Sequence, residues 1–158
     1  MERPKSFTFL FFFTIWSVLQ GLESLIGPAG SRLQFEEYNL SILYYIFIAI
    51  AVLGGIALVF AIYKRKVWGY QTGLIWLISG IVYSGYVGII SIINKPLMEA
   101  ILIAQREQKG RPVEDVSDFI NSTGFDATII ITTLVMIVIM GFFIWKLLQN
   151  KSYFSEKF

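Results

Sequence analysis

Four long apolar stretches restrict the folds that this sequence can adopt. Residues 7–26 contain one charged residue, Glu23, and residues 42–63, 67–93 and 127–145 contain none. An α-helix needs about 20 mostly apolar residues to cross the roughly 30 Å hydrocarbon core of a bilayer. Each stretch is about twice as long as a strand of an outer-membrane barrel, and none shows the alternating pattern of such a strand. The sequence therefore predicts an all-α protein, a bundle of four transmembrane helices.

The composition agrees with a chain that is surrounded by lipid. Of the 158 residues, 56% are hydrophobic and 15% are charged, whereas about a quarter are charged in a typical soluble protein. The sequence contains no cysteine or histidine, so it offers no disulfide, thiolate nucleophile, imidazole base or Cys/His zinc site. We expect a single integral membrane domain over residues 1–158. We assign no catalytic, cofactor-binding or metal-binding residue.

The charges outside the apolar stretches predict an orientation in the membrane. The N-terminus, the turn at 64–66 and the C-terminal tail together carry eight Lys and Arg against two Glu. The other side carries five Lys and Arg against nine acidic residues. Short loops that face the cytoplasm are enriched in Lys and Arg. We therefore expect both termini to be cytoplasmic, in a prokaryotic plasma membrane, and residues 94–126 to form an extracytoplasmic loop.

The first apolar stretch also has the outline of a cleaved signal peptide. A basic segment precedes it, and Gly27, Pro28 and Ala29 form a small-residue site after it, so that cleavage would remove residues 1–29. The apolar run continues past Leu19 to Ile26, which is long for the apolar part of a signal peptide. We favour a retained helix for this reason. Cleavage would leave the orientation of the other three helices unchanged.

The third stretch carries small residues at helical spacing, a pattern that predicts close packing of helices. Small side chains let two helix backbones approach within a membrane, where lipid offers no hydrophobic drive for association. We expect these residues to contact other helices of the same bundle, and the alternative is a seam between two copies of the chain. The predicted packing residues are Gly69, Gly73, Gly80, Ser84, Gly88 and Ser91, with Ala51, Gly54 and Gly55 as a shorter counterpart in the second stretch.

Two polar residues are candidates for a specific role. Glu23 lies near the outer end of the first stretch, and a charged group inside a membrane is a functional candidate by default. We expect Glu23 to anchor its helix among the head groups, and the alternative is that it lines a polar path. Asn121 begins an Asn-Ser-Thr sequon on the side assigned as external. It is a candidate glycosylation site if the source organism modifies external loops.

The long loop contains the pattern of a short amphipathic helix. Pro96 suits a first helical turn, and Gly110 ends the segment. We expect this helix to lie on the outer membrane face or over the end of the bundle, because its apolar stripe would otherwise be left in water. The stripe consists of Leu97, Met98, Ile101 and Leu102.

The two ends of the chain resemble a known group of membrane proteins. The chain opens with Arg3-Pro4-Lys5-Ser6-Phe7-Thr8-Phe9-Leu10, and it closes with Trp145-Lys146-Leu147-Leu148 and Lys151-Ser152-Tyr153-Phe154. Both segments are similar to the ends of small four-helix prokaryotic integral membrane proteins, which typically start with Arg-Pro shortly before an apolar helix. The resemblance implies a four-helix membrane protein from a group of largely unknown function. It implies no site residues.

Three classes of function fit these features. The first is an accessory or scaffold subunit that binds a membrane-protein partner, or a second copy of itself, through helix faces and the outer loop. The second is a small transporter or channel component working as an oligomer, which requires a polar path. The third is a lipid-modifying enzyme, which requires acid/base groups clustered at one interface. We expect the first, with the lipid bilayer as surroundings. The net charge of +2 gives no reason to expect a nucleic-acid partner.

Overall fold

Four membrane-length helices make up most of the computed structural model, which describes residues 5–26 and 30–154. They are α1 (Lys5–Ile26), a second segment over Ser41–Lys64, α5 (Trp68–Ile93) and α8 (Thr123–Gln149). The second segment consists of α3 (Ser41–Ala49), the π-helical turn η1 (Ile50–Gly54) and α4 (Gly55–Lys64). All four are long and apolar enough to cross a membrane, so the prediction of an all-α chain with four such helices is confirmed.

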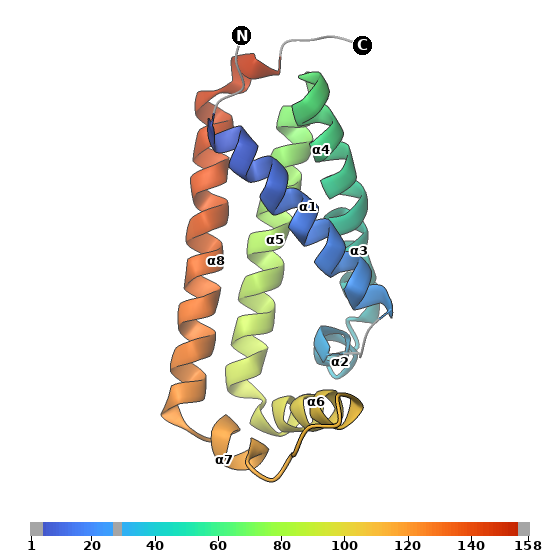
Figure 1. Ribbon diagram of the computed structural model, residues 1–158, viewed down its shortest axis with the longest axis vertical. Helices are drawn as coiled ribbons and strands as arrows, with labels where there is room; N and C mark the ends of the chain where they lie inside the picture. Colours follow the sequence, from blue (N-terminus) through green and yellow to red (C-terminus); the bar gives the residue numbers. More distant parts are fainter. Residues whose placement is uncertain (1–4, 27–29, 155–158) are drawn as a thin grey trace.

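The two ends of the bundle differ in shape and in charge (Figure 1). One end holds both ends of the described chain and the turn between α4 and α5. We call this the basic end, because its charged residues within 5–26 and 30–154 are all Lys or Arg. The opposite end is covered by a structure that we call the cap. It consists of α2 (Gly30–Glu36), α6 (Lys95–Gln108), α7 (Val116–Ile120) and the residues 109–115 between α6 and α7.

Aromatic side chains from the first and last described segments meet at the basic end. The ring of Phe7 lies 4.9 Å from the ring of Tyr153 and 5.4 Å from that of Phe154. The Tyr153 hydroxyl donates a hydrogen bond of 3.0 Å to the carbonyl oxygen of Ile62 in α4. All three aromatic side chains are buried. The turn η2 (Lys151–Tyr153) therefore holds α1, α4 and α8 together at this end.

The small residues of α5 face other helices of the same chain. A Cβ added to Gly73 would lie 2.9 Å from Leu147, and one added to Gly88 would lie 2.4 Å from the hydroxyl oxygen of Thr133. Both contacts are with α8. A Cβ on Gly69 would lie 2.5 Å from Ala61 in α4. In these places a larger side chain would separate the helix backbones.

The second apolar stretch makes a similar close contact with α1. A Cβ on Gly55 would lie 2.5 Å from Val18 and 3.2 Å from the indole nitrogen of Trp76 in α5, and one on Gly54 would lie 3.4 Å from the same indole. On the opposite side of this contact, a Cβ on Gly21 of α1 would lie 2.9 Å from Val52. The small residues therefore let α1 lie close against the second helix over several turns.

The cap is a folded part of the chain that shares a small core with the start of α8. Val116 and Ile120 of α7 are buried there together with Phe125 of α8. Asn94 caps the start of α6 by accepting a hydrogen bond of 3.1 Å from the backbone of Leu97. The stripe residue Ile101 is 3% exposed, whereas the other members of the predicted stripe are partly buried: Leu97, Met98 and Leu102.

Two ionic contacts fix the cap. The Lys95 ammonium pairs with Asp126 in the first turn of α8 and donates a hydrogen bond of 2.9 Å to the carbonyl oxygen of Ile120. On the far side of the cap, Arg106 pairs with Asp115 and so joins the end of α6 to the start of α7. One ion pair therefore joins the connection between α5 and α8 to α8 itself. The other joins two parts of the connection, the end of α6 and the start of α7.

Some helices of the structure begin or occur where the sequence did not predict them. The last membrane-length helix begins at Thr123, four residues before the predicted stretch, because the Ser122 hydroxyl accepts a hydrogen bond from the backbone of Phe125 and caps it. Neither α2 nor the π-helical turn was expected from the sequence. Several predictions concern residues outside the described ranges: Arg3, Pro4, the site at 27–29, and the tail from 155 to 158.

Candidate functional site

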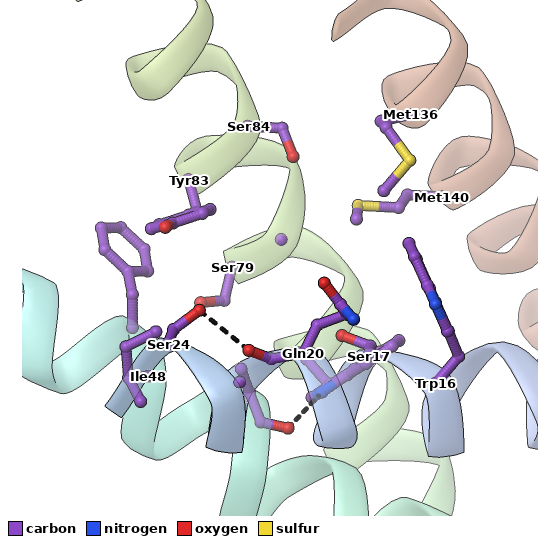
Figure 2. Close-up of a pocket in the computed structure, with 15 residues that line it drawn as sticks. Trp16, Ser17, Gln20, Ser24, Ile48, Ser79, Tyr83, Ser84, Met136 and Met140 are labelled. Atoms are coloured by element: carbon purple, nitrogen blue, oxygen red, sulfur yellow. Dashed lines mark hydrogen bonds between the residues drawn. The ribbon is translucent and has the colours of Figure 1, made fainter. Parts of the chain in front are cut away.

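A pocket of about 220 Å³ lies between the helices (Figure 2). Residues of α1, of the α3–η1 segment, of α5 and of α8 form its walls. Its aromatic and thioether side chains are those of Trp16, Phe47, Trp76, Tyr83, Met136 and Met140. Its polar side chains are those of Ser17, Gln20, Ser24, Ser79 and Ser84, together with the Tyr83 hydroxyl. The pocket therefore combines an apolar wall with several neutral polar groups, as small-molecule sites commonly do.

The tilt of α1 produces the pocket. Near the basic end, α1 lies against α8, where the rings of Phe13 and Phe143 are 5.6 Å apart. Toward the cap it leans to α3, where the Tyr44 hydroxyl donates a hydrogen bond of 3.0 Å to the carbonyl oxygen of Ser24. Figure 1 shows this diagonal course of α1 across the other helices. The pocket lies where α1 has left α8, so Met136 and Met140 of α8 line it opposite Gln20 of α1.

Three hydroxyl groups of the pocket make no hydrogen bond to any other part of the chain that the structure describes. They belong to Ser17 of α1 and to Ser79 and Ser84 of α5. Several other helix hydroxyls donate to the carbonyl oxygen one turn earlier, as those of Thr14 and Ser91 do at 2.7 Å. A hydroxyl in an apolar environment loses free energy when it has no partner. The three pocket hydroxyls are therefore available to a ligand.

The π-helical turn contributes to the same pocket. Ala51 belongs to η1 and lines the pocket, and its carbonyl oxygen accepts a hydrogen bond of 3.1 Å from the Trp76 indole. A π-helical turn carries one residue more than an α-helical turn, and such turns occur often at functional sites. The Trp76 side chain, 5% exposed, is held in this way as part of the pocket wall.

Glu23, the one charged residue of the first apolar stretch, is not part of the pocket lining. Its side chain is exposed on α1 and accepts a hydrogen bond of 3.3 Å from the Gln20 amide. Of the predicted packing residues, Ser84 and Gly80 of α5 and Ala51 of η1 lie in the pocket. A Cβ added to Gly80 would lie 2.8 Å from the terminal methyl carbon of Met140.

No protein-family model, curated protein or solved structure matches this chain. The resemblance of its two ends to small four-helix prokaryotic membrane proteins therefore stays a prediction.

The predicted residue Ser91 lies at a second polar junction, between the bundle and the cap. Gln34 of α2 is 2% exposed, and its amide nitrogen lies 3.0 Å from the Ser91 hydroxyl oxygen and 2.9 Å from the Met98 sulfur. The amide oxygen of Gln34 has no partner among the described residues. Gln34 thus connects α2 with α5 and α6, and neither Gln34, Ser91 nor Met98 lines the pocket.

Asn121 lies at the end of α7 and is exposed. Its side-chain nitrogen donates a hydrogen bond of 2.9 Å to the carbonyl oxygen of Ser117. Within residues 5–26 and 30–154, the structure contains no group of three or more acidic residues that is placed to hold a metal ion.

The sequence indicated only part of the pocket. Gln20 and Ser84 stand out as polar or small residues within apolar stretches, but Ser17 and Ser79 have no spacing that relates them to each other. They share a pocket because α1 crosses α5 at an angle, and that angle is set by packing among distant residues. A signal that could have drawn attention to them is the presence of three serines, at 17, 79 and 84, well inside stretches that are otherwise apolar.

Proposed function

We propose that the protein is an accessory subunit of the cell membrane that binds a partner membrane protein through the exposed surface of its cap. The observation that carries the proposal is that the long connection between α5 and α8 is folded. Ordering a chain costs roughly 1–2 kcal/mol per residue in backbone entropy. A shorter turn would join the two helices if the connection had no other role.

The exposed side of the cap has a mixed charge. Glu107, Lys109, Glu114 and Asp118 are exposed, and Phe119 beside them is 44% exposed. The buried side of the cap is held against the bundle, so the backbone positions that carry these side chains keep a fixed arrangement relative to one another. A fixed surface with both signs of charge and an exposed aromatic ring favours recognition of one partner over others.

The orientation that we propose places the cap outside the cell and the basic end in the cytoplasm. It is supported by the segregation of charge between the two ends. The described charged residues of the basic end are Lys5, Lys64, Arg65, Lys66, Lys146 and Lys151, whereas the acidic residues of the described chain are all nearer the cap. Positively charged loops tend to remain in the cytoplasm during insertion.

Site-specific photo-crosslinking in native membranes tests the proposed function. A photoreactive phenylalanine analogue at Glu114 or Asp118, both exposed in the cap, is expected to give a covalent product with one partner protein. The same analogue at Val138, which is 68% exposed on α8, serves as the control because it samples whatever surrounds the helices. If neither cap position gives a product and the gently solubilised protein has the mass of one chain, the proposed function is wrong.

A further inference from the structure

We propose that the pocket between α1, α5 and α8 binds the head group of an uncharged lipid, one that carries hydroxyl or carbonyl oxygens. The lipid's apolar chain would remain in the bilayer. This binding site is independent of the cap, because the residues that form the pocket and those that form the cap are different.

The polar groups of the pocket define the chemistry of the ligand. The free hydroxyls of Ser17, Ser79 and Ser84 can each donate one hydrogen bond and accept others. In a bilayer, water is scarce as an alternative partner at the depth of these residues, so a ligand oxygen is the natural complement. A purely apolar ligand would offer none of the three hydroxyls a hydrogen-bond partner.

The lack of charge in the pocket excludes ionic head groups. In the described part of the chain, no Asp, Glu, Lys or Arg lines it. Moving a charged group to this depth without a counter-ion is costly. Glu23 is the nearest acidic residue along α1, and it is exposed outside the lining, where it would repel an anion. A neutral head group meets the hydrogen-bonding groups without this cost.

The opening of the pocket explains why the ligand should be a lipid. Trp16 lines the pocket and is 52% exposed, and Gln20 and Ser24 of the same helix are also exposed. The pocket therefore opens sideways from the bundle, where α1 departs from α8. Its volume of about 220 Å³ is below the roughly 300–1,000 Å³ of sites that enclose a drug-sized molecule. It accommodates a head group, and the chain attached to it can leave through the opening.

The α8 side of the pocket is adaptable. Met136 and Met140 are unbranched and can change shape around a ligand, and thioethers contact aromatic rings favourably. Gly80 has no side chain and so lets the flexible end of Met140 lie close to α5. Trp76 on the opposite side is fixed by its hydrogen bond to Ala51. One rigid and one adaptable wall suit a head group that enters from the side.

Tryptophan fluorescence provides a direct test in the full-length protein. Replacing Trp68 and Trp145 by Phe leaves Trp16 and Trp76, the two tryptophans of the pocket. The protein is placed in nanodiscs of phosphatidylcholine. Three probes are titrated separately: a monoacylglycerol with a brominated chain, a lysophosphatidic acid with the same chain, and decyl-benzoquinone. Bromine and quinone rings quench indole fluorescence at short range.

We expect saturable quenching by one or both of the neutral probes. Saturation by the monoacylglycerol identifies a hydroxyl head group, and saturation by the quinone identifies a carbonyl head group. Lysophosphatidic acid should bind at least about tenfold more weakly, since a charge would have to enter the uncharged pocket. Absence of saturation with both neutral probes, or equal binding of the anionic one, overturns the proposal.

Variants show whether the quenching comes from the pocket. Ser79→Ala together with Ser84→Ala should weaken binding of the neutral probe about tenfold, because a hydrogen bond within a membrane typically changes a dissociation constant about threefold. Thr132→Ala removes a hydroxyl from the exposed face of α8 and should have no effect. If the double serine variant binds as tightly as the Thr132→Ala control, the hydroxyls are not ligands and the proposal is wrong.

Discussion

The shortest contact of the small residues on α5 is at Gly88, and enlarging this residue should force α5 and α8 apart. A Cβ at Gly88 would lie 2.4, 3.1 and 3.2 Å from the Oγ1, Cγ2 and Cβ atoms of Thr133. All three atoms belong to one β-branched side chain, whose χ1 rotation is restricted in a helix. Rotation cannot move the Thr133 Cβ in any case. The substitution Gly88→Ala can therefore be accommodated only by moving a helix backbone.

Gly80 occupies an equivalent place in the sequence pattern but has a different neighbour. A Cβ there would lie 2.8 Å from Cε and 2.9 Å from Sδ of Met140, the flexible end of an unbranched side chain. Overpacking of a rigid contact costs about 1–3 kcal/mol. Ala in place of Gly within a helix returns up to about 1 kcal/mol. We expect Gly88→Ala to lower the free energy of unfolding by about 1–2 kcal/mol, and Gly80→Ala to change it by less than about 0.5 kcal/mol.

Unfolding by SDS in mixed micelles, followed by circular dichroism, measures these differences. Gly85→Ala is the matched control on the same helix, because a Cβ at Gly85 meets nothing within 4 Å. Adding Thr133→Ala to Gly88→Ala removes two of the three clashing atoms and should recover part of the loss. If Gly88→Ala and Gly85→Ala unfold at the same SDS fraction, or if Gly80→Ala is the more destabilising, the packing argument is refuted.

Three further predictions concern the ends of the bundle. A cysteine at Ser117 in this cysteine-free chain should react with an impermeant thiol reagent from outside the cell, and one at Ser152 should not; the reverse pattern rejects the proposed orientation. Ile101→Ser should cost about 1.5–3 kcal/mol of local stability, which hydrogen exchange of the α6 amides would detect as faster exchange. Tyr153→Phe should lower the unfolding free energy by about 1 kcal/mol, because the hydrogen bond to Ile62 is lost, and an unchanged SDS transition would contradict this.

The membrane-length helices were predictable because their signal is local. A sufficiently long run of apolar residues predicts a membrane-length helix whatever the rest of the sequence contains. The predicted ranges agree with the helices to within a few residues at most ends. The difference is largest for α8, which continues past Trp145 to Gln149 and begins at Thr123. Polar residues continue the helix beyond its apolar part, so hydropathy alone underestimates its length.

The elements that escaped prediction depend on contacts between distant residues. The helix α2 has only seven residues, and Phe35 within it is fully buried against Tyr44, Tyr83 and Tyr86. The π-helical turn at Ile50–Gly54 leaves no sequence pattern. Small residues on α5 predicted a face that packs against another helix. Which helix covers that face depends on how all the helices pack together, so the sequence pattern alone did not identify it.

The aromatic contact at the basic end has a consequence for the order in which the chain matures. Translation proceeds from the N-terminus, so Phe7 is made long before its two ring partners, Tyr153 and Phe154. Until these two residues have been made, no aromatic ring covers Phe7 at this end of α1. The nascent protein therefore remains open at the basic end until η2 follows α8, and a chain released before residue 153 would leave the Phe7 ring uncovered.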